Sequence, residues 1–259
     1  MKKINENLQS MGYFLSGIAA LVLFWELSSR FTDGALPGPV STWSVFSELL
    51  KDPFYDYGPN DKGIGILLGG SILRVMYGFL LGTLIAVPAG ILLGSSKVAM
   101  NIFNPVVQIL RPVSPLAWFP IGLAVFQSAP SATVFIIFIT SLWPTLINTA
   151  FGVSTVPQDH KNVAKAFGFS KFKYVTKILF PYSLPHIFTG LRLSIGVAWL
   201  VIVAGEMLSG GAGIGFFIWD SWNAGSMENI IGGILIIGVV GLLLDKGFSL
   251  LQTSFSYEK

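Results

Sequence analysis

The chain has 259 residues, of which 53% are hydrophobic and only 11% are charged, and its formal net charge at pH 7 is +3. Soluble domains carry about 25% charged residues, so this composition excludes an ordinary soluble domain and indicates a protein that crosses a membrane several times. The chain has no cysteine, which excludes disulfide bonds and thiolate metal sites.

Six segments are apolar enough to cross a bilayer, which takes about 20 residues. They are residues 11–29, 72–93, 102–126, 132–151, 187–208 and 230–250. The first follows two lysines, as a signal peptide would, but no small-residue cleavage site closes it, so we expect a retained span. Lysines gather at both termini and in residues 155–185, which the positive-inside rule places in the cytoplasm. The predicted fold is an all-α integral membrane protein with six transmembrane helices and cytoplasmic termini.

The segment between the first two spans, residues 31–65, is expected outside the cytoplasm. Its LPGP sequence predicts a turn, and the apolar spacing of Ser41–Leu50 predicts a helix that lies in the membrane interface. The polar stretch Asp52–Gly63 contains three Asp residues that could bind a cation, but a solvated loop is the favoured interpretation. After the fifth span, the glycines and aromatic residues of Ser209–Asn229 predict an outer loop anchored at the interface.

Small residues recur four positions apart in the second span, as Gly78/Gly82 and Gly90/Gly94. This spacing permits a neighbouring helix to approach closely. Arg74 lies near the outer end of the same span, and Glu206 near the outer end of the fifth. We expect the two charges to neutralise each other, and both are candidates for the substrate pathway.

The third span contains Pro105, Pro112, Pro115 and Pro120. Prolines at this density disrupt the helical hydrogen bonds, and unpaired backbone is tolerated at membrane depth only where protein or water satisfies it, which indicates a cavity or pathway. Arg111 lies in this segment without a local acid, so it could bind an anionic solute through two hydrogen bonds. Alternatively, it bonds carbonyls freed by the prolines or lies at the interface. Ser114 and Trp118 are further pathway candidates, although packing is the more ordinary role of Trp118.

The longest polar interruption is residues 155–185, which contain five lysines and a single acid, Asp159. The pattern predicts a short helix after Pro157, capped by Ser154 or Thr155 and stopped by Gly168. Ser170 should cap a second helix, which Pro181 and Pro185 should end. Such an element between two spans is typical of a docking surface for a soluble partner, and a basic loop lying on anionic lipid is the alternative.

Several chemistries have no basis in the sequence. There is no GxxxxGK[ST] motif for ATP, no HExxH and no GxSxG, and the two histidines stand alone. No set of residues supports an enzyme, so we expect this chain to have no catalytic activity of its own. The remaining classes are a permease powered by a partner, a secondary transporter or channel, and a membrane scaffold.

The 155–185 stretch resembles the signature loop of ABC importer permeases, E-A-A-x-x-x-G followed by nine residues and I-x-L-P. Ala164, Gly168, Ile178 and Pro181 match, while Asn162, Val163 and Phe180 depart from the pattern. The sequences LPGPVSTW, NPVVQILRPVSPLAWFPIGL, FPYSLPHIFTGLRLSIGVAW and AGEMLSGGAGIGFFIWDSWN resemble the nitrate/sulfonate/taurine/bicarbonate branch. Within it, RPVSPLAWFPIGL, DPFYDYGPNDKG and GFFIWDSWN are most similar to nitrate permeases.

This resemblance implies the type I importer fold, with an N-terminal part at 1–62, a core at 63–251 and a cytoplasmic tail at 252–259. It implies import of nitrate or nitrite across a bacterial plasma membrane, with bicarbonate, cyanate or sulfonate and taurine as alternatives. The implied partners are a second copy of the chain, two cytoplasmic ATPase subunits that bind ATP and Mg, and an extracytoplasmic binding protein; no nucleic acid is implied. The implied ATPase-coupling residues are Asn162, Val163, Ala164, Phe167, Gly168, Phe169, Ser170 and Phe172.

Overall fold

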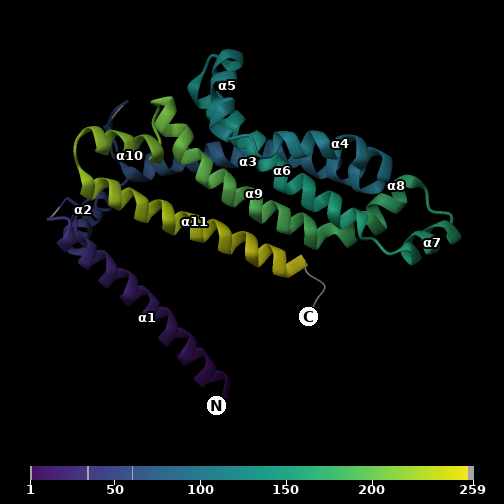
Figure 1. The fold of residues 1–259 in the computed structure, drawn as a ribbon, viewed down its shortest axis with the longest axis horizontal. Helices are drawn as coiled ribbons and strands as arrows, with labels where there is room; N and C mark the ends of the chain where they lie inside the picture. Colours follow the sequence, from purple (N-terminus) through teal and green to yellow (C-terminus); the bar gives the residue numbers. More distant parts are fainter. Residues whose placement is uncertain (1, 34, 60, 256–259) are drawn as a thin grey trace.

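The structure is a computed structural model that describes residues 2–33, 35–59 and 61–255. Within this part of the chain, five helices are long and apolar enough to span a membrane (Figure 1). A bent pair of shorter helices completes the six predicted spans, which confirms the all-α membrane fold. The five long helices are α1 (Lys2–Phe31), α3 (Ile64–Ser95), α6 (Ala129–Ser154), α9 (Phe180–Ser209) and α11 (Met227–Phe255).

The third span is broken, as its prolines predict. Helix α4 (Lys97–Leu110) and the segment Pro115–Phe126 meet at 92°. That second segment consists of the 3-10 turn η1 (Pro115–Trp118) and helix α5 (Phe119–Phe126). Pro112 and Pro115 supply no backbone N–H at the bend, so the helical ladder cannot continue through it. No residue of α4 is buried in the single chain.

The core of the molecule is formed where α6 packs between α3 and α9. Ile136 and Ile137 of α6 and Ile195 of α9 are completely buried there. Hydroxyl groups reinforce the contact, since the Thr145 and Ser194 side-chain oxygens lie 2.8 Å apart. In an apolar bilayer such packing and interhelical hydrogen bonds, rather than exclusion from water, hold helices together.

Gly78, Gly82, Gly90 and Gly94 of α3 lie against α6, as their spacing predicts. A Cβ added at Gly78 would meet Ile137 at 2.6 Å, and one added at Gly90 would meet Thr149 at 2.6 Å. Gly94 lies closer still, because its added Cβ would be 2.3 Å from the Ala150 carbonyl oxygen. These positions bring the two helix backbones together, and a larger residue would force them apart.

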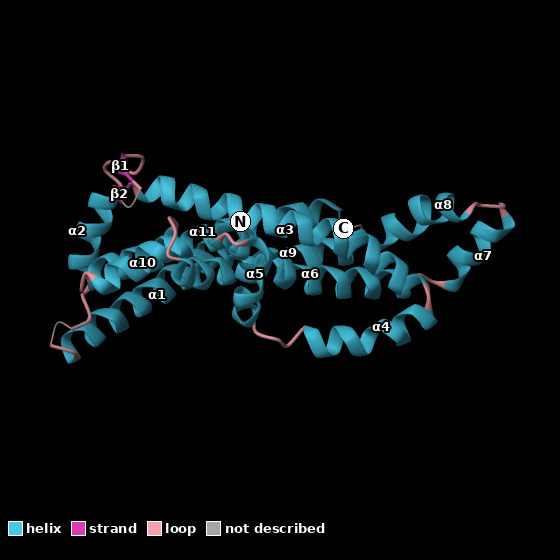
Figure 2. Ribbon diagram, turned by 90° about the horizontal axis from the view of Figure 1, so that it is seen from above, coloured by secondary structure: helices cyan, strands magenta, loops and turns pink. Residues whose placement is uncertain are grey.

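The elements outside the spans gather at opposite ends of the bundle (Figure 2). At one end lie α2 (Pro39–Leu49), the antiparallel strands β1 (Asp56–Gly58) and β2 (Asp61–Lys62), and α10 (Ile214–Asn223). At the other end lie α7 (Gln158–Ala166) and α8 (Lys171–Tyr174). The helix predicted at 41–50 is confirmed as α2. The two expected outer loops are more ordered than predicted, because one contains the β1–β2 hairpin and the other contains α10.

The hairpin is held by an ion pair between Lys62 Nζ and Asp56 Oδ2 at 2.5 Å. The hydrogen bond from Lys62 holds the pKa of the Asp56 carboxyl below its ordinary value.

The first helix, α1, stands apart from the bundle and contacts α2 (Figure 1). This helix carries an exposed ion pair between Arg30 Nε and Glu26 Oε1, which lie 2.9 Å apart.

Candidate functional site

Helix α7 is the first helix of the polar loop at the cytoplasmic end of the bundle. A glycine, Gly168, follows the end of this helix. Gly168 has φ +61°, a left-handed conformation that glycine adopts without steric cost. The N–H of Phe169 donates to the Ala164 carbonyl at 2.9 Å, and the N–H of Gly168 donates to the Lys165 carbonyl at 3.0 Å. These two bonds define a Schellman motif, so the predicted stop at Gly168 is confirmed.

The two predicted helix caps have different outcomes. Ser170 caps α8, because its Oγ accepts a hydrogen bond from the Lys173 N–H at 3.3 Å. The cap predicted for α7 is wrong, since its N-terminal residue Pro157 provides no side-chain hydrogen bond. The hydroxyls of Ser154 and Thr155 instead donate to carbonyls three residues earlier in the chain. They do so because α6 continues to Ser154 and leaves its last carbonyls without helical partners.

The expectation that Pro181 and Pro185 end the second helix is also wrong. Helix α8 passes through a π-helical turn, η2 (Val175–Leu179), directly into α9. Pro181 lies in the first turn of α9, where its missing N–H matters least, and Pro185 lies inside the helix. The π turn shifts the hydrogen-bond register ahead of the prolines, so residues 171–209 remain helical throughout. The loop is therefore joined rigidly to a transmembrane helix.

Large apolar side chains on this polar loop point away from the protein. Val163, Phe167 and Phe172 are 51%, 76% and 80% exposed, whereas Ala164 between the first two is only 4% exposed. Val163 and Phe167 are four residues apart on α7 and share one face. Asn162, where the resembled family has an acid, accepts a hydrogen bond from Gln158 Nε2 at 3.2 Å. Exposed apolar groups gathered on a water-facing loop indicate an interaction surface.

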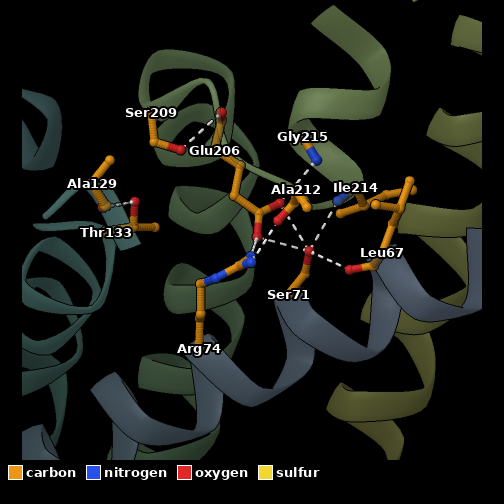
Figure 3. A network of polar contacts seen from close by, with 10 residues as sticks. All are labelled: Leu67, Ser71, Arg74, Ala129, Thr133, Glu206, Ser209, Ala212, Ile214 and Gly215. Carbon is orange, nitrogen blue, oxygen red and sulfur yellow. Dashed lines mark hydrogen bonds and ion pairs between the residues drawn. The ribbon is translucent and has the colours of Figure 1, made fainter. Parts of the chain in front are cut away.

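At the opposite end of the bundle, Arg74 of α3 forms an ion pair with Glu206 of α9 (Figure 3). The predicted neutralisation of these two charges is thus confirmed. Glu206 is 1% exposed, so its carboxylate needs the partners that surround it. The Ser71 hydroxyl lies 2.8 Å from both carboxylate oxygens.

The same network holds the start of α10. The N–H of Ile214 donates to Ser71 Oγ at 3.0 Å, and the N–H of Gly215 donates to Glu206 Oε2 at 3.0 Å (Figure 3). Two N–H groups of the first helical turn are therefore satisfied by side chains from other helices. Arg74 also donates to the Ala212 carbonyl. The network fastens α10 and the preceding glycine-rich turn to α3 and α9.

Three predicted pathway residues lie at the bend of the third span. Arg111 directly follows α4, and its side chain is exposed in the single chain. Ser114 precedes η1, and Trp118 ends it, packed partly against the core. The Trp118 Nε1 is buried and has no hydrogen-bond partner among the residues that the structure describes. None of the three belongs to the Arg74–Glu206 network.

The sequence reasoning missed one intramembrane pair. Arg192 of α9 binds Asp245 of α11 through two hydrogen bonds of 2.7 Å, from Nε and Nη2 to the two carboxylate oxygens. The available signal was Asp245, an acid that follows an uninterrupted apolar run, since such residues usually face a partner.

Most of the chain matches a known protein family. Residues 63–256 match the family described as the binding-protein-dependent transport system inner membrane component. The nitrate import permease protein NrtB of Synechocystis sp. is 45% identical over 236 residues, which cover 91% of this chain and 86% of that protein. The bicarbonate transport system permease protein CmpB of Synechocystis sp. is 46% identical over 239 residues, covering 91% and 85%.

A solved structure supports the fold independently. A chain of the MetNI methionine ABC transporter, in an inward-facing conformation, aligns with a TM-score of 0.66 at 12% identity. The alignment covers 74% of this chain and 96% of that chain. The relatives are permease subunits of ABC importers, in which separate subunits hydrolyse ATP. This chain belongs to the binding-protein-dependent transport system inner membrane component family, and it is a multi-pass permease subunit of an inner-membrane ABC importer.

Proposed function

We propose that this chain is the permease subunit of an ATP-driven importer for a small inorganic anion, and that the anion is nitrate or nitrite. The observation that carries the proposal is the loop of α7 and α8, which presents exposed Val163, Phe167 and Phe172 on a helical element fused to α9. The 45% identity to a nitrate import permease supports the choice of anion.

The proposed complex contains two copies of this chain and two cytoplasmic ATPase subunits, which bind ATP and Mg. An extracytoplasmic binding protein delivers the anion. The exposed face of α7 would sit in a groove of the ATPase, with the signature residues Asn162 to Phe172 as the coupling element. We likewise propose the division into an N-terminal part at 1–62, a permease core at 63–251 and a tail at 252–259.

The mechanism we propose is alternating access. Closure of the ATPase pair moves residues 155–185, here called the coupling loop. The continuous helix from α8 through η2 carries that motion into α9. Helix α9 has 30 residues, which span about 45 Å at 1.5 Å per residue. Its far end carries Glu206, whose bonds to Ser71 and Gly215 fasten α10. One rigid element therefore links the ATPase surface to the outer end of the bundle.

The pathway residues we propose are Arg111, Ser114 and Trp118 at the bend of the third span, and Arg74 and Glu206 in the separate network at the outer end. Arg74 is compensated by Glu206, whereas Arg111 forms no ion pair with any residue that the structure describes. A guanidinium without a carboxylate suits a planar monovalent anion, which it can bind through two hydrogen bonds. Bicarbonate is likewise a planar monovalent anion, and the 46% identity to a bicarbonate permease makes it the second candidate.

The test is ATP hydrolysis by the complex that co-purifies with this chain, reconstituted in lipid with its binding protein. Nitrate-loaded binding protein should stimulate hydrolysis, while bicarbonate, cyanate and taurine should not. Stimulation by bicarbonate alone would transfer the proposal to that anion. A chain that purifies without any ATPase would overturn the proposed function.

A further inference from the structure

A cavity of about 280 Å³ lies beneath the coupling loop, between α7–α8 and the cytoplasmic ends of α3 and α6. Lys161, Lys165 and Lys171 line it together with apolar residues. Among the latter, Val153 and Leu179 are buried in the protein. The cavity thus combines three cationic groups with an apolar floor.

The charges in this cavity are uncompensated. Its lining contains no acidic residue, and none of the three lysines forms an ion pair with a residue that the structure describes. The Asp159 side chain lies two residues before Lys161, which places it about 200° around the helix. The Tyr174 hydroxyl also lines the cavity, is buried, and lacks a hydrogen-bond partner within the described residues. The described part of the protein therefore offers no ion-pair partner to the three ammonium groups and no acceptor to the Tyr174 hydroxyl.

The cavity and the exposed apolar face lie on opposite sides of α7. Lys161 and Lys165 are four residues apart and share a face with buried Ala164. Val163 comes two residues after Lys161, and Phe167 comes two residues after Lys165. A step of two residues is a rotation of about 200° around the helix. A soluble partner that covers the Val163–Phe167 face therefore leaves the lysines of the cavity uncovered on the other side of the helix.

We propose that this cavity binds the phosphate group of an anion at the cytoplasmic membrane surface. The lysine ammonium groups would contact the phosphate oxygens, and the Tyr174 hydroxyl would donate a hydrogen bond to them. Gly94 and Ser95, the last residues of α3, line the cavity and place it where a span leaves the hydrocarbon. An anionic phospholipid headgroup and free inorganic phosphate share this chemistry. Basic pockets of this kind at cytoplasmic helix ends bind acidic headgroups.

A phosphate bound at this site would stabilise the coupling loop on the side that faces α3 and α6. A bound phosphate joins Lys161 and Lys165 of α7 to Lys171 of α8 across the Gly168 turn. The two interpretations of the basic loop, a docking surface and a lipid contact, then apply to opposite faces of the same helix. The effect on coupling rests on the proposed function, whereas the binding site itself does not.

The test compares two variants of the full-length chain with equal net charge. In the first, Lys161, Lys165 and Lys171 are replaced by Gln. In the control, Lys173, Lys177 and Lys246, which do not line the cavity, are replaced by Gln. Phosphatidylglycerol bound to each purified protein is titrated by native mass spectrometry, with phosphatidylcholine and inorganic phosphate as separate arms and no ATPase present.

Each cavity lysine should contribute about fivefold to phosphatidylglycerol affinity, so the cavity variant should bind about 100-fold more weakly than the control. Tyr174→Phe, which changes no charge, should weaken binding about tenfold. If millimolar inorganic phosphate competes with phosphatidylglycerol, the site belongs to the soluble ion. If it does not compete, the site belongs to the lipid headgroup. Equal lipid binding by the cavity variant and the control would overturn the proposal.

Discussion

The Ser71 hydroxyl on α3 lies 2.8 Å from the Glu206 carboxylate on α9, and the same hydroxyl accepts the N–H of Ile214 at 3.0 Å. One small side chain on α3 thereby connects to α9 and to α10, at residues 135 and 143 positions later in the sequence. Because Glu206 is almost fully buried, its charge depends on Arg74 and on these hydrogen bonds. The network is the structural tie between the outer helix α10 and the span that carries the coupling loop.

Replacing Glu206 by Gln should destabilise the protein. The amide keeps the shape of the side chain but leaves Arg74 without a counter-charge, and breaking a buried pair in this way costs about 3 kcal/mol. Thermal unfolding of the purified protein in detergent measures the effect. The double variant Arg74→Met with Glu206→Gln should recover part of the loss, because no unpaired charge remains.

The matched control is Glu26→Gln, which breaks the exposed Glu26–Arg30 pair on α1. Exposed pairs contribute about 0.5 kcal/mol or less, so this change should leave the unfolding temperature nearly unaltered. Equal effects of the two substitutions would show that the Glu206 network does not hold the outer end together.

Gly90→Ala should weaken the contact between α3 and α6. The added Cβ would lie 2.6 Å from the Thr149 Cβ and 2.9 Å from the Leu146 carbonyl oxygen, so the helices must separate. Overpacking of this kind costs about 1–3 kcal/mol. Gly69→Ala on the same helix is the control, since its Cβ would meet nothing within 4 Å. The control should be neutral or stabilising because Ala favours helix over Gly; equal destabilisation by both would refute the close packing.

Phe167→Ser and Phe172→Ser should weaken ATPase binding without lowering stability. Both rings are largely exposed in the single chain, so folding loses little when they are removed. If they are central contacts with the partner, each contributes about 2 kcal/mol, or about thirtyfold in affinity. Co-purification and a binding titration measure the loss. The control is Phe31, an exposed ring at the C-terminal end of α1. Phe31→Ser should change neither the ATPase affinity nor the stability of the protein.

Arg111→Ala should abolish anion import while leaving assembly intact, if the guanidinium contacts the substrate. Arg111→Lys keeps the charge but loses the two-point geometry, so it should retain only partial activity. Uptake at several nitrate concentrations separates weaker binding from slower turnover. Normal import by an assembled Arg111→Ala complex would remove this residue from the pathway.

Local features of this fold were predictable from the sequence. The spans follow from apolar length, and the stop at Gly168 follows from a left-handed conformation that glycine favours. The Arg74–Glu206 pair was predictable because both charges lie near the same end of their spans. The glycine spacing of α3 likewise predicted a tight interface.

Features that depend on register or on distant partners were not predictable. Arg192 and Asp245 are 53 residues apart in sequence, and helical periodicity does not say which faces of α9 and α11 meet. The π turn at Val175–Leu179 moves the hydrogen bonds so that Pro181 no longer ends a helix, and no residue pattern marks such a turn. The helix α10 depends on caps supplied by Ser71 and Glu206 from other spans.

The most direct measurement is uptake of isotope-labelled nitrate into proteoliposomes that contain the complex, external binding protein and internal ATP. We predict ATP-dependent accumulation that unlabelled nitrate inhibits, that bicarbonate does not inhibit, and that the Phe167→Ser and Phe172→Ser double variant loses. Accumulation without ATP, or by a double variant that binds no ATPase, would contradict the claim that this chain is driven through its cytoplasmic loop.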